Sequence, residues 1–534
     1  MLFEPLFERF ASGTPLSVMT RALLENALQP DPLDELFERL AVTQYTRELL
    51  FSTVVETMAL VACRIYKSPR AVYTEHPDWF PVTLKCVYEK LQGIELPVMR
   101  QMVRDHAGRS QGIIEELGGQ VPALLPGYRV KILDGNALAG TDHRLKELRQ
   151  TTAAALPGKS LVVLDPALGL AIDVIPCEDG HAQERSLLAD VIRTVEPRDL
   201  WIEDRNFCTL GFIFGVARRQ GFVLVREHKG LPWQAKSPLR DMGRTETGAV
   251  SEQEVEITDE DGQSLRLRRI VIRLDEPTRD GEMEVVLLTN VRGVRALRLA
   301  RLYLQRWSIE GLFNVLTTTL SCEQTSLGYP KAALFSFCVT LVTYNVLATV
   351  KAALRSVHGS DKVEEEVSLP LVMEHVRRNY EGMMVGLPPE GWLQFRGLSA
   401  VEMAGCLRHW AAGVCLAKVR KAKSNPRKKA KAKPAHDPSK PHVSTARLLA
   451  ARRRQGLNIL TNGSSTLPSP HYRHREIPGF RTCARRSWPG SWCGWRRRFA
   501  SRAALLLSLA AFSLRSRSAK ISRSRPANLA AGVT

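Results

Sequence analysis

A chain of 534 residues exceeds what one hydrophobic core usually organises, so we expect roughly two to four folded units. Its composition, 44% hydrophobic and 24% charged, is that of a globular protein, and its ten cysteines form no CxxC pair and no Cys/His cluster at zinc spacing. This excludes a disulfide scaffold and a structural zinc site, and it favours a reducing, cytoplasmic environment. The net charge of +20 is unevenly distributed: residues 1–416 hold 47 basic and 53 acidic residues, whereas residues 417–534 hold 28 and 2.

Residues 1–115 have the apolar spacing of helices, as in Leu33, Leu36, Phe37 and Leu40. They predict a separate helical domain. The first residues mix acids with apolar side chains and lack the basic patch of a signal peptide. Later apolar runs are too short or too polar for the roughly 20 residues that span a bilayer, so we expect no membrane segment.

Three β-rich runs follow Gly127, and alternating helices and strands come after them. The runs lie at 129–134, 160–165 and 170–175; a helix is expected near 182–195, a strand at 200–203, a helix near 210–219 and a strand at 222–226. An RNase H-like fold requires this order, because an antiparallel meander of three strands continues there into parallel strands through helical crossovers. The sequence therefore predicts an α/β protein with an RNase H-like catalytic domain over residues 125–355. Other α/β folds share the order.

Period-two patterns return between residues 230 and 293, with Asp261-Gly262 and Asp280-Gly281 as turn signals. They predict a β-strand insertion. Helical spacing then covers 295–317, and a core helix is expected at 335–354. Residues 356–416 predict a helical C-terminal extension.

From residue 417 the chain becomes rich in Lys, Ala and Pro, and later in Arg, Ser and Pro. Such a composition buries too little apolar surface to fold, so residues 417–534 are expected to form a disordered basic tail. Residues 457–534 resemble translated GC-rich DNA in a foreign frame, which suggests the hypothesis that this part extends past the natural end.

Three acids are candidates for chemistry. Asp134 and Asp204 end predicted strands, which in open α/β sheets face the crevice that holds the site. Glu310 lies on a predicted helix, on the side that also carries Tyr303 and Arg306. Three converging carboxylates repel one another, and binding of a hard cation such as Mg²⁺ or Mn²⁺ offsets that repulsion. A single strand-end Asp is more often a turn residue, and this is the role we expect for Asp165.

These residues carry a resemblance to a known family. Residues 134–354 resemble transposases of insertion-sequence family 4, a DDE family whose β insertion separates the second Asp from a Glu in a Tyr-Arg-Glu-Lys signature. Tyr303, Arg306 and Glu310 match that signature, and Asp204 lies in DRNF, which is similar to the family's Asp-Arg-Gly-Phe form.

The resemblance implies metal-dependent cleavage and strand transfer at the ends of an insertion sequence. Asp134, Asp204 and Glu310 would hold two Mg²⁺ or Mn²⁺ ions about 3.5–4 Å apart. Tyr303 and Arg306 would contact a phosphate near a flipped base. Trp307 is a candidate stacking residue whose spacing also suits the core, and Arg226 is a further candidate DNA contact because its strand opens toward the same crevice. The implied partners are double-stranded DNA, as terminal repeats bound by residues 1–115 and as target, and a second subunit in a homodimer on DNA. The implied location is the bacterial cytoplasm, at the nucleoid.

One position departs from the signature: Thr317 stands where the family has Lys. Loss of this cation removes a phosphate contact but leaves the carboxylates in place. Two alternatives therefore stay open, a catalytically impaired remnant that only binds DNA and a metal-dependent nuclease of the same fold.

Overall fold

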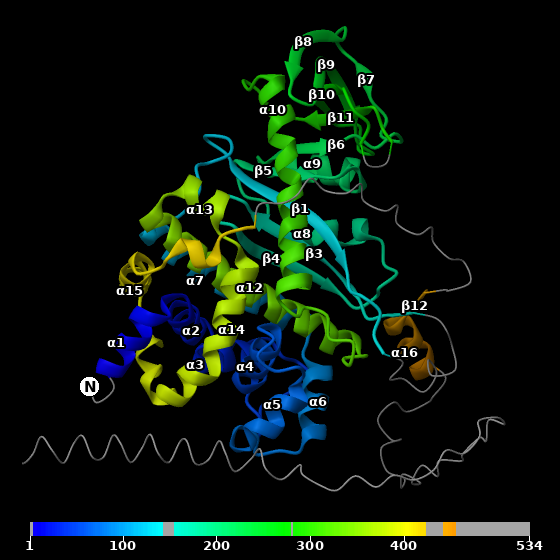
Figure 1. Cartoon of the computed structure of the whole chain (residues 1–534). Helices are drawn as coiled ribbons and strands as arrows, with labels where there is room; N and C mark the ends of the chain where they lie inside the picture. The colour runs from blue at the N-terminus through cyan, green and yellow to red at the C-terminus, as the bar shows by residue number, and fades with distance from the viewer. Residues whose placement is uncertain (1–3, 143–153, 279–280, 423–441, 455–534) are drawn as a thin grey trace, which may run out of the picture. The chain divides into compact units, whose positions relative to one another are not determined.

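The computed structural model of the chain describes residues 4–142, 154–278, 281–422 and 442–454 (Figure 1). All of them fall within one compact unit, Met1–Asn462. Before the first strand the structure has helices α1 (Glu4–Gly13), α2 (Pro15–Ala27), α3 (Pro30–Leu40), α4 (Phe51–Ala62), α5 (Pro69–Glu75), α6 (Leu84–Gly93) and α7 (Leu96–Leu117), with a 3-10 turn η1 (Pro77–Trp79). Several of these helices begin with Pro in their first turn, where its missing N–H costs nothing.

The described strands form a mixed sheet of ten strands and a small sheet of two. The large sheet contains β1 (Arg129–Ala137), β3 (Lys159–Asp165), β4 (Leu170–Cys177), β5 (Asp199–Glu203), β6 (Phe222–Arg226), β7 (Gln234–Ala235), β8 (Arg240–Thr245), β9 (Gly248–Thr258), β10 (Ser264–Leu274) and β11 (Glu284–Thr289). Its order is β4-β3-β1-β5-β6-β11-β10-β9-β7, with β8 against β9. The small sheet pairs β2 (Ala154–Leu156) with β12 (His442–Ser444) in parallel. The predicted α/β class is therefore confirmed.

Strand directions change within the large sheet. β4, β3 and β1 are antiparallel neighbours, whereas β1, β5 and β6 run parallel. The connections between the parallel strands contain η3 (Glu184–Leu187), α8 (Leu188–Ile192), η4 (Arg205–Phe207) and α9 (Leu210–Arg218). The β insertion was predicted within the catalytic domain, and its place in the sheet was not predicted. β11 pairs antiparallel with β6, so the insertion extends the main sheet.

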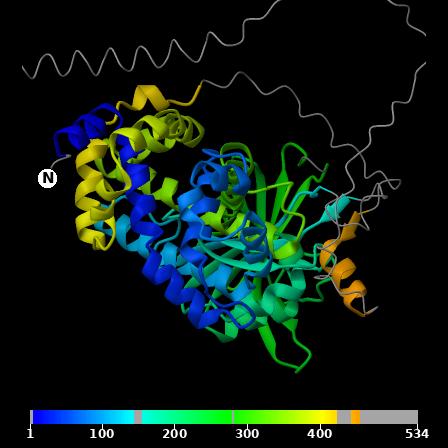
Figure 2. The same ribbon diagram turned by 90° about the horizontal axis from the view of Figure 1, so that it is seen from below.

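The two faces of the sheet have different covers, because side chains alternate along a strand. On one face, Ile132, Ile202 and Leu224 share a core with the amino-terminal helices and with α12 (Pro330–His358). On the other face, Leu133, Trp201 and Val223 pack with α8 and α9. Figure 2 shows the early helices (blue) and late helices (yellow) together on one side of the strands. Residues 1–115 therefore share a core with the sheet and do not form the separate domain that was predicted.

The helix α12 lies at the centre of this shared core. The amide group of Asn345 both donates to and accepts from the backbone of Ala171 in β4, at 2.9 Å each, which ties the helix to the sheet. Among the described helices, only α12 is long and apolar enough to cross a membrane. Its most apolar stretch is fully buried inside the protein. The predicted core helix at 335–354 is confirmed and is longer than expected.

The predicted helix at 295–317 is divided. It consists of α10 (Ala296–Tyr303), a 3-10 segment η5 (Leu304–Trp307), α11 (Ser308–Asn314) and a π-helical turn η6 (Val315–Thr319). After α12 the chain forms the α-helices α13 (Ser360–Glu366), α14 (Leu369–Gly386) and α15 (Ala400–Ala412). It also forms the 3-10 turns η7 (Pro389–Gly391), η8 (Leu393–Phe395) and η9 (Leu416–Val419). The predicted helical extension at 356–416 is thus present.

The prediction that the whole of residues 417–534 lacks regular structure is wrong for one segment. β12 and α16 (Thr445–Arg454) pack against the body: Leu449 contacts Ala155 and Tyr329, and Asp179 accepts hydrogen bonds from Ser444 at 2.6 Å and Arg447 at 2.7 Å. These partners come from distant parts of the chain, so local composition does not reveal them. Residues 423–441 and 455–534 lie outside the described residues.

Candidate active site

Three candidate residues lie at one level of neighbouring parallel strands. The registers of β1, β5 and β6 end on the pairs Ile132–Ile202 and Glu203–Val225, and the next residues along these strands bring Asp134, Asp204 and Arg226 close together. The residues two positions earlier in each strand belong to the core shared with the helices: Ile132, Ile202 and Leu224. Because side chains alternate, Asp134, Asp204 and Arg226 emerge on that same face, under the segment α10–α11.

The segment α10–α11 supplies the remaining candidates. Arg306 lies between two predicted ligands: its Nη1 is 3.4 Å from Oδ2 of Asp134, and its Nη2 donates to Oε1 of Glu310 at 3.0 Å. The other oxygen of Asp134 accepts the N–H of Gly135 at 2.8 Å. The Arg306 side chain is 13% exposed and that of Glu310 56% exposed, so the guanidinium is largely withdrawn from water while Glu310 faces it.

Burial and charge set the protonation of this site. Burial raises the pKa of Asp134 to about 6, with further contributions from the carboxylates of Asp204 and Glu184, while Gly135 and Arg306 oppose the shift. Burial, together with the charge of Asp204, also raises the pKa of Tyr303. The Tyr303 hydroxyl is buried and has no hydrogen-bond partner among the described residues. A buried donor without a partner costs free energy unless a ligand accepts from it.

The carboxylates fit a hard cation by chemistry and only in part by position. Asp134 and Asp204 supply the oxygen ligands that Mg²⁺ and Mn²⁺ prefer, from adjacent strand ends. In the described part of the chain, however, no three Asp, Glu, His or Cys side chains are grouped closely enough to hold a metal. The reason is visible in the contacts: the Arg306 guanidinium separates Glu310 from Asp134.

Arg226 and Trp307 have different surroundings. Arg226 forms an ion pair with Glu282, to which Arg205 also donates at 2.7 Å. These hydrogen bonds lower the pKa of Glu282 and keep it charged. Trp307 is 54% exposed beside Arg306, whose guanidinium lies 6.0 Å from the indole centre. Its exposure favours a surface for stacking over a place in the core.

Thr317 lies in the π-helical turn that follows Glu310. Its hydroxyl bonds back to the carbonyls of Phe313 at 3.0 Å and Asn314 at 3.2 Å, and its own carbonyl accepts from Arg64 at 2.9 Å. π-helical turns are rare overall, but those that occur are often found at functional sites. Position 317 has no cation of its own, but the cation of Arg64 lies next to it.

Several polar residues around the site were not predicted. Glu184 accepts from Asn206 at 2.6 Å, and a Cβ at Gly135 would lie 2.1 Å from Oε1 of Glu184, so only glycine permits this approach. Asn206 is two residues from Asp204, which is the sole local signal; Glu184 and Glu282 have none. The predicted turn role of Asp165 is confirmed, since its Oδ1 accepts the N–H groups of two following residues, Ala167 and Leu168.

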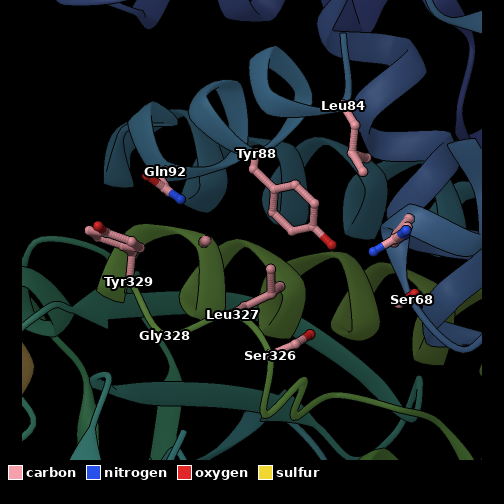
Figure 3. A pocket seen from close by; sticks show the side chains of 10 residues that line it. Ser68, Leu84, Tyr88, Gln92, Ser326, Leu327, Gly328 and Tyr329 are labelled. Carbon is pink, nitrogen blue, oxygen red and sulfur yellow. The ribbon is translucent and has the colours of Figure 1, made fainter. Parts of the chain in front are cut away.

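A cavity of about 440 Å³ lies apart from the carboxylates, between α6 and the start of α12 (Figure 3). Tyr88 and Gln92 face Leu327 and Tyr329 across it. None of the predicted site residues lines this cavity, so the candidate site is defined by the strand ends and not by the hollow.

Comparisons with known proteins do not contribute to the assignment of the candidate site, which rests on the contacts described above. No family model matches the chain, and no curated protein matches it significantly.

Proposed function

We propose that this protein is a DDE transposase, which cleaves and joins DNA at the ends of an insertion sequence with the help of divalent metal ions. The observation that supports this best is the alignment of Asp134 and Asp204 on adjacent strands under a helix that carries Tyr303, Arg306 and Glu310. The chain order Asp, Asp, β insertion, Glu is that of the family it resembles.

The finer fold assignment belongs to the same proposal. We infer an RNase H-like fold from the strand order β4-β3-β1-β5-β6, with an antiparallel meander followed by parallel strands. Crossover connections put the carboxyl ends of β1 and β5 at one edge, which is where open α/β sheets carry their sites.

In the proposed mechanism, Asp134, Asp204 and Glu310 would hold Mg²⁺ or Mn²⁺, which would supply Lewis-acid activation of water or of a 3′-hydroxyl. The chain's own residues bind and orient the DNA. The planar guanidinium of Arg306 matches a phosphate in two-point hydrogen bonding. The unpaired Tyr303 hydroxyl donates toward the same phosphate, and Trp307 offers an exposed ring to an unstacked base.

Binding of a phosphate by Arg306 has a consequence for the carboxylates. Two of the five N–H donors of Arg306 are directed at Asp134 and Glu310, so a phosphate bound at two points competes with these acids for the guanidinium. Metal held by the acids would then compensate their charges. We therefore propose that DNA and metal bind cooperatively.

Cleavage of DNA carrying the ends that flank the gene tests the proposal. The wild type is expected to nick the end-labelled DNA with Mg²⁺ or Mn²⁺, and Glu310→Gln is expected to bind the DNA without nicking it. Nicking without joining would indicate a nuclease, and binding without nicking by the wild type would indicate the impaired remnant. Absence of binding by both proteins would contradict the proposed function.

A further inference from the structure

Arg64 adopts a backbone conformation that is unusual for its residue type. Helix α4 ends with two backbone hydrogen bonds, from Ile65 N–H to Leu60 at 3.0 Å and from Arg64 N–H to Val61 at 2.9 Å. In this terminating motif the residue equivalent to Arg64 is usually glycine, because its φ is positive, here 56°. A non-glycine residue at such a position costs conformational free energy, and residues in such conformations cluster at functional sites.

The Arg64 side chain reaches the segment that carries Glu310. Its Nη2 donates to the carbonyl of Thr317 at 2.9 Å, and the N–H of Ser321 donates to the carbonyl of Ala62 at 2.9 Å. The end of α4 is thereby fastened to the end of η6. Within the described ranges no carboxylate forms an ion pair with Arg64, and the residue is exposed.

Arg64 also continues a row of exposed residues. Trp307, Glu310, Asn314 and Thr317 follow one another at spacings of three and four, and all are exposed. The row thus offers, in order, a ring, an acid, an amide and a hydroxyl, with a guanidinium at its end. From Glu310 to Thr317 a helix rises roughly 10 Å, which is about three nucleotide steps of 3.4 Å.

We propose that Arg64 binds a phosphate of the same DNA strand whose scissile phosphate lies at the carboxylates. Helix α4 thus supplies, from outside the catalytic helix, the cation that position 317 lacks. The guanidinium uses one N–H on Thr317, which fixes its position, and keeps its remaining donors for the phosphate. This inference rests on the proposed function, and it assigns to the helical amino-terminal region a contact at the active site.

Binding of a fluorescent duplex DNA over a series of KCl concentrations tests it, using the full chain without added metal. Arg64→Gly removes the cation and suits the positive φ, so the fold is expected to persist, and circular dichroism checks this. Loss of one phosphate contact lowers the salt slope by about 0.9 and weakens binding about fivefold at 0.15 M KCl. Arg64→Lys is expected to stay close to the wild type, and Thr317→Lys added to Arg64→Gly is expected to restore the slope.

Arg408→Ala is the matched control, because Nη2 of Arg408 also donates to a backbone carbonyl, that of Glu116 at 2.9 Å, on an exposed surface. If Arg64→Gly binds DNA as Arg408→Ala does, or if Thr317→Lys restores nothing, the inference is overturned. Metal-dependent nicking by the same Arg64→Gly preparation separates the two claims: nicking with unchanged binding refutes only the role of Arg64. A wild type that binds no duplex refutes both.

Discussion

Two adjacent acids, Glu203 and Asp204, leave the end of β5 on opposite faces of the sheet and meet opposite surroundings. Asp204 lies on the face where Arg306 and Arg226 compensate carboxylates. Glu203 is fully buried among apolar side chains, and neither of its oxygens has a hydrogen-bond partner among the described residues. Burial raises the pKa of Glu203 well above its ordinary value.

The difference shows that acidity in sequence does not identify a ligand. The two residues have similar chemistry and adjacent positions, and only the alternation of side chains across the sheet separates them. A carboxylate beside arginines at the end of a strand is suited to bind a cation, whereas an acid in the core without a hydrogen-bond partner is not.

Exchanging each acid for its amide gives the largest expected contrast. Asp204→Asn is expected to reduce metal-dependent DNA nicking by about 10³-fold or more, since it would remove a proposed metal ligand that sustains several kcal/mol of charge stabilisation. Glu203→Gln, which changes a buried acid on the opposite face of the sheet, is expected to nick like the wild type. Equal losses of nicking activity in the two variants would contradict the difference between the two faces of the sheet.

Removing the Arg306 guanidinium, which lies on the same face of the sheet as Asp204, should alter the affinity of the site for metal. Arg306→Gln is expected to bind Mn²⁺ roughly tenfold more tightly in the absence of DNA, because charge-assisted hydrogen bonds to Asp134 and Glu310 no longer compete. It should bind DNA more weakly. Calorimetric titration with Mn²⁺ measures this, with Arg301→Gln as control, since Arg301 of α10 pairs with Glu246 instead. Unchanged Mn²⁺ affinity would show that Arg306 does not compete with metal.

A smaller effect concerns stability and pH. The pKa of Asp134 is raised in the folded state, to about 6 from 3.8, so its ionisation destabilises the fold as pH rises from about 4 through 6. Without metal, Asp134→Asn is expected to gain about 2–3 kcal/mol of unfolding free energy at pH 8 and little at pH 4. Urea unfolding at both pH values checks this. A gain of equal size at both pH values would contradict the raised pKa.

The sequence predicted the fold where the signal is local and failed where the partners are distant. The succession of strands and helices from residue 129 to 226 follows from periodicity, and the predicted acids Asp134 and Asp204 do come level. β2 and β12 were missed because each has three residues and the two strands that pair lie far apart in the chain. The pairing of β11 with β6, which joins the insertion to the sheet, has no signature in either strand.

The site divides in the same way. Tyr303, Arg306 and Glu310 lie on one short segment, so their spacing could be recognised in the sequence. The contact of Arg306 with Asp134 joins residues 172 positions apart, and that of Arg64 with Thr317 joins residues 253 apart. Such contacts depend on how helices pack on the sheet, and a single sequence gives no measure of that packing.

The most direct test of the proposed site is the position of Mn²⁺ in a crystal of the protein bound to DNA, located by anomalous scattering. The account predicts anomalous peaks coordinated by Asp134, Asp204 and Glu310, with Arg306 moved from the carboxylates to a DNA phosphate. Peaks elsewhere, or Arg306 still between Asp134 and Glu310 with DNA and Mn²⁺ present, would contradict it.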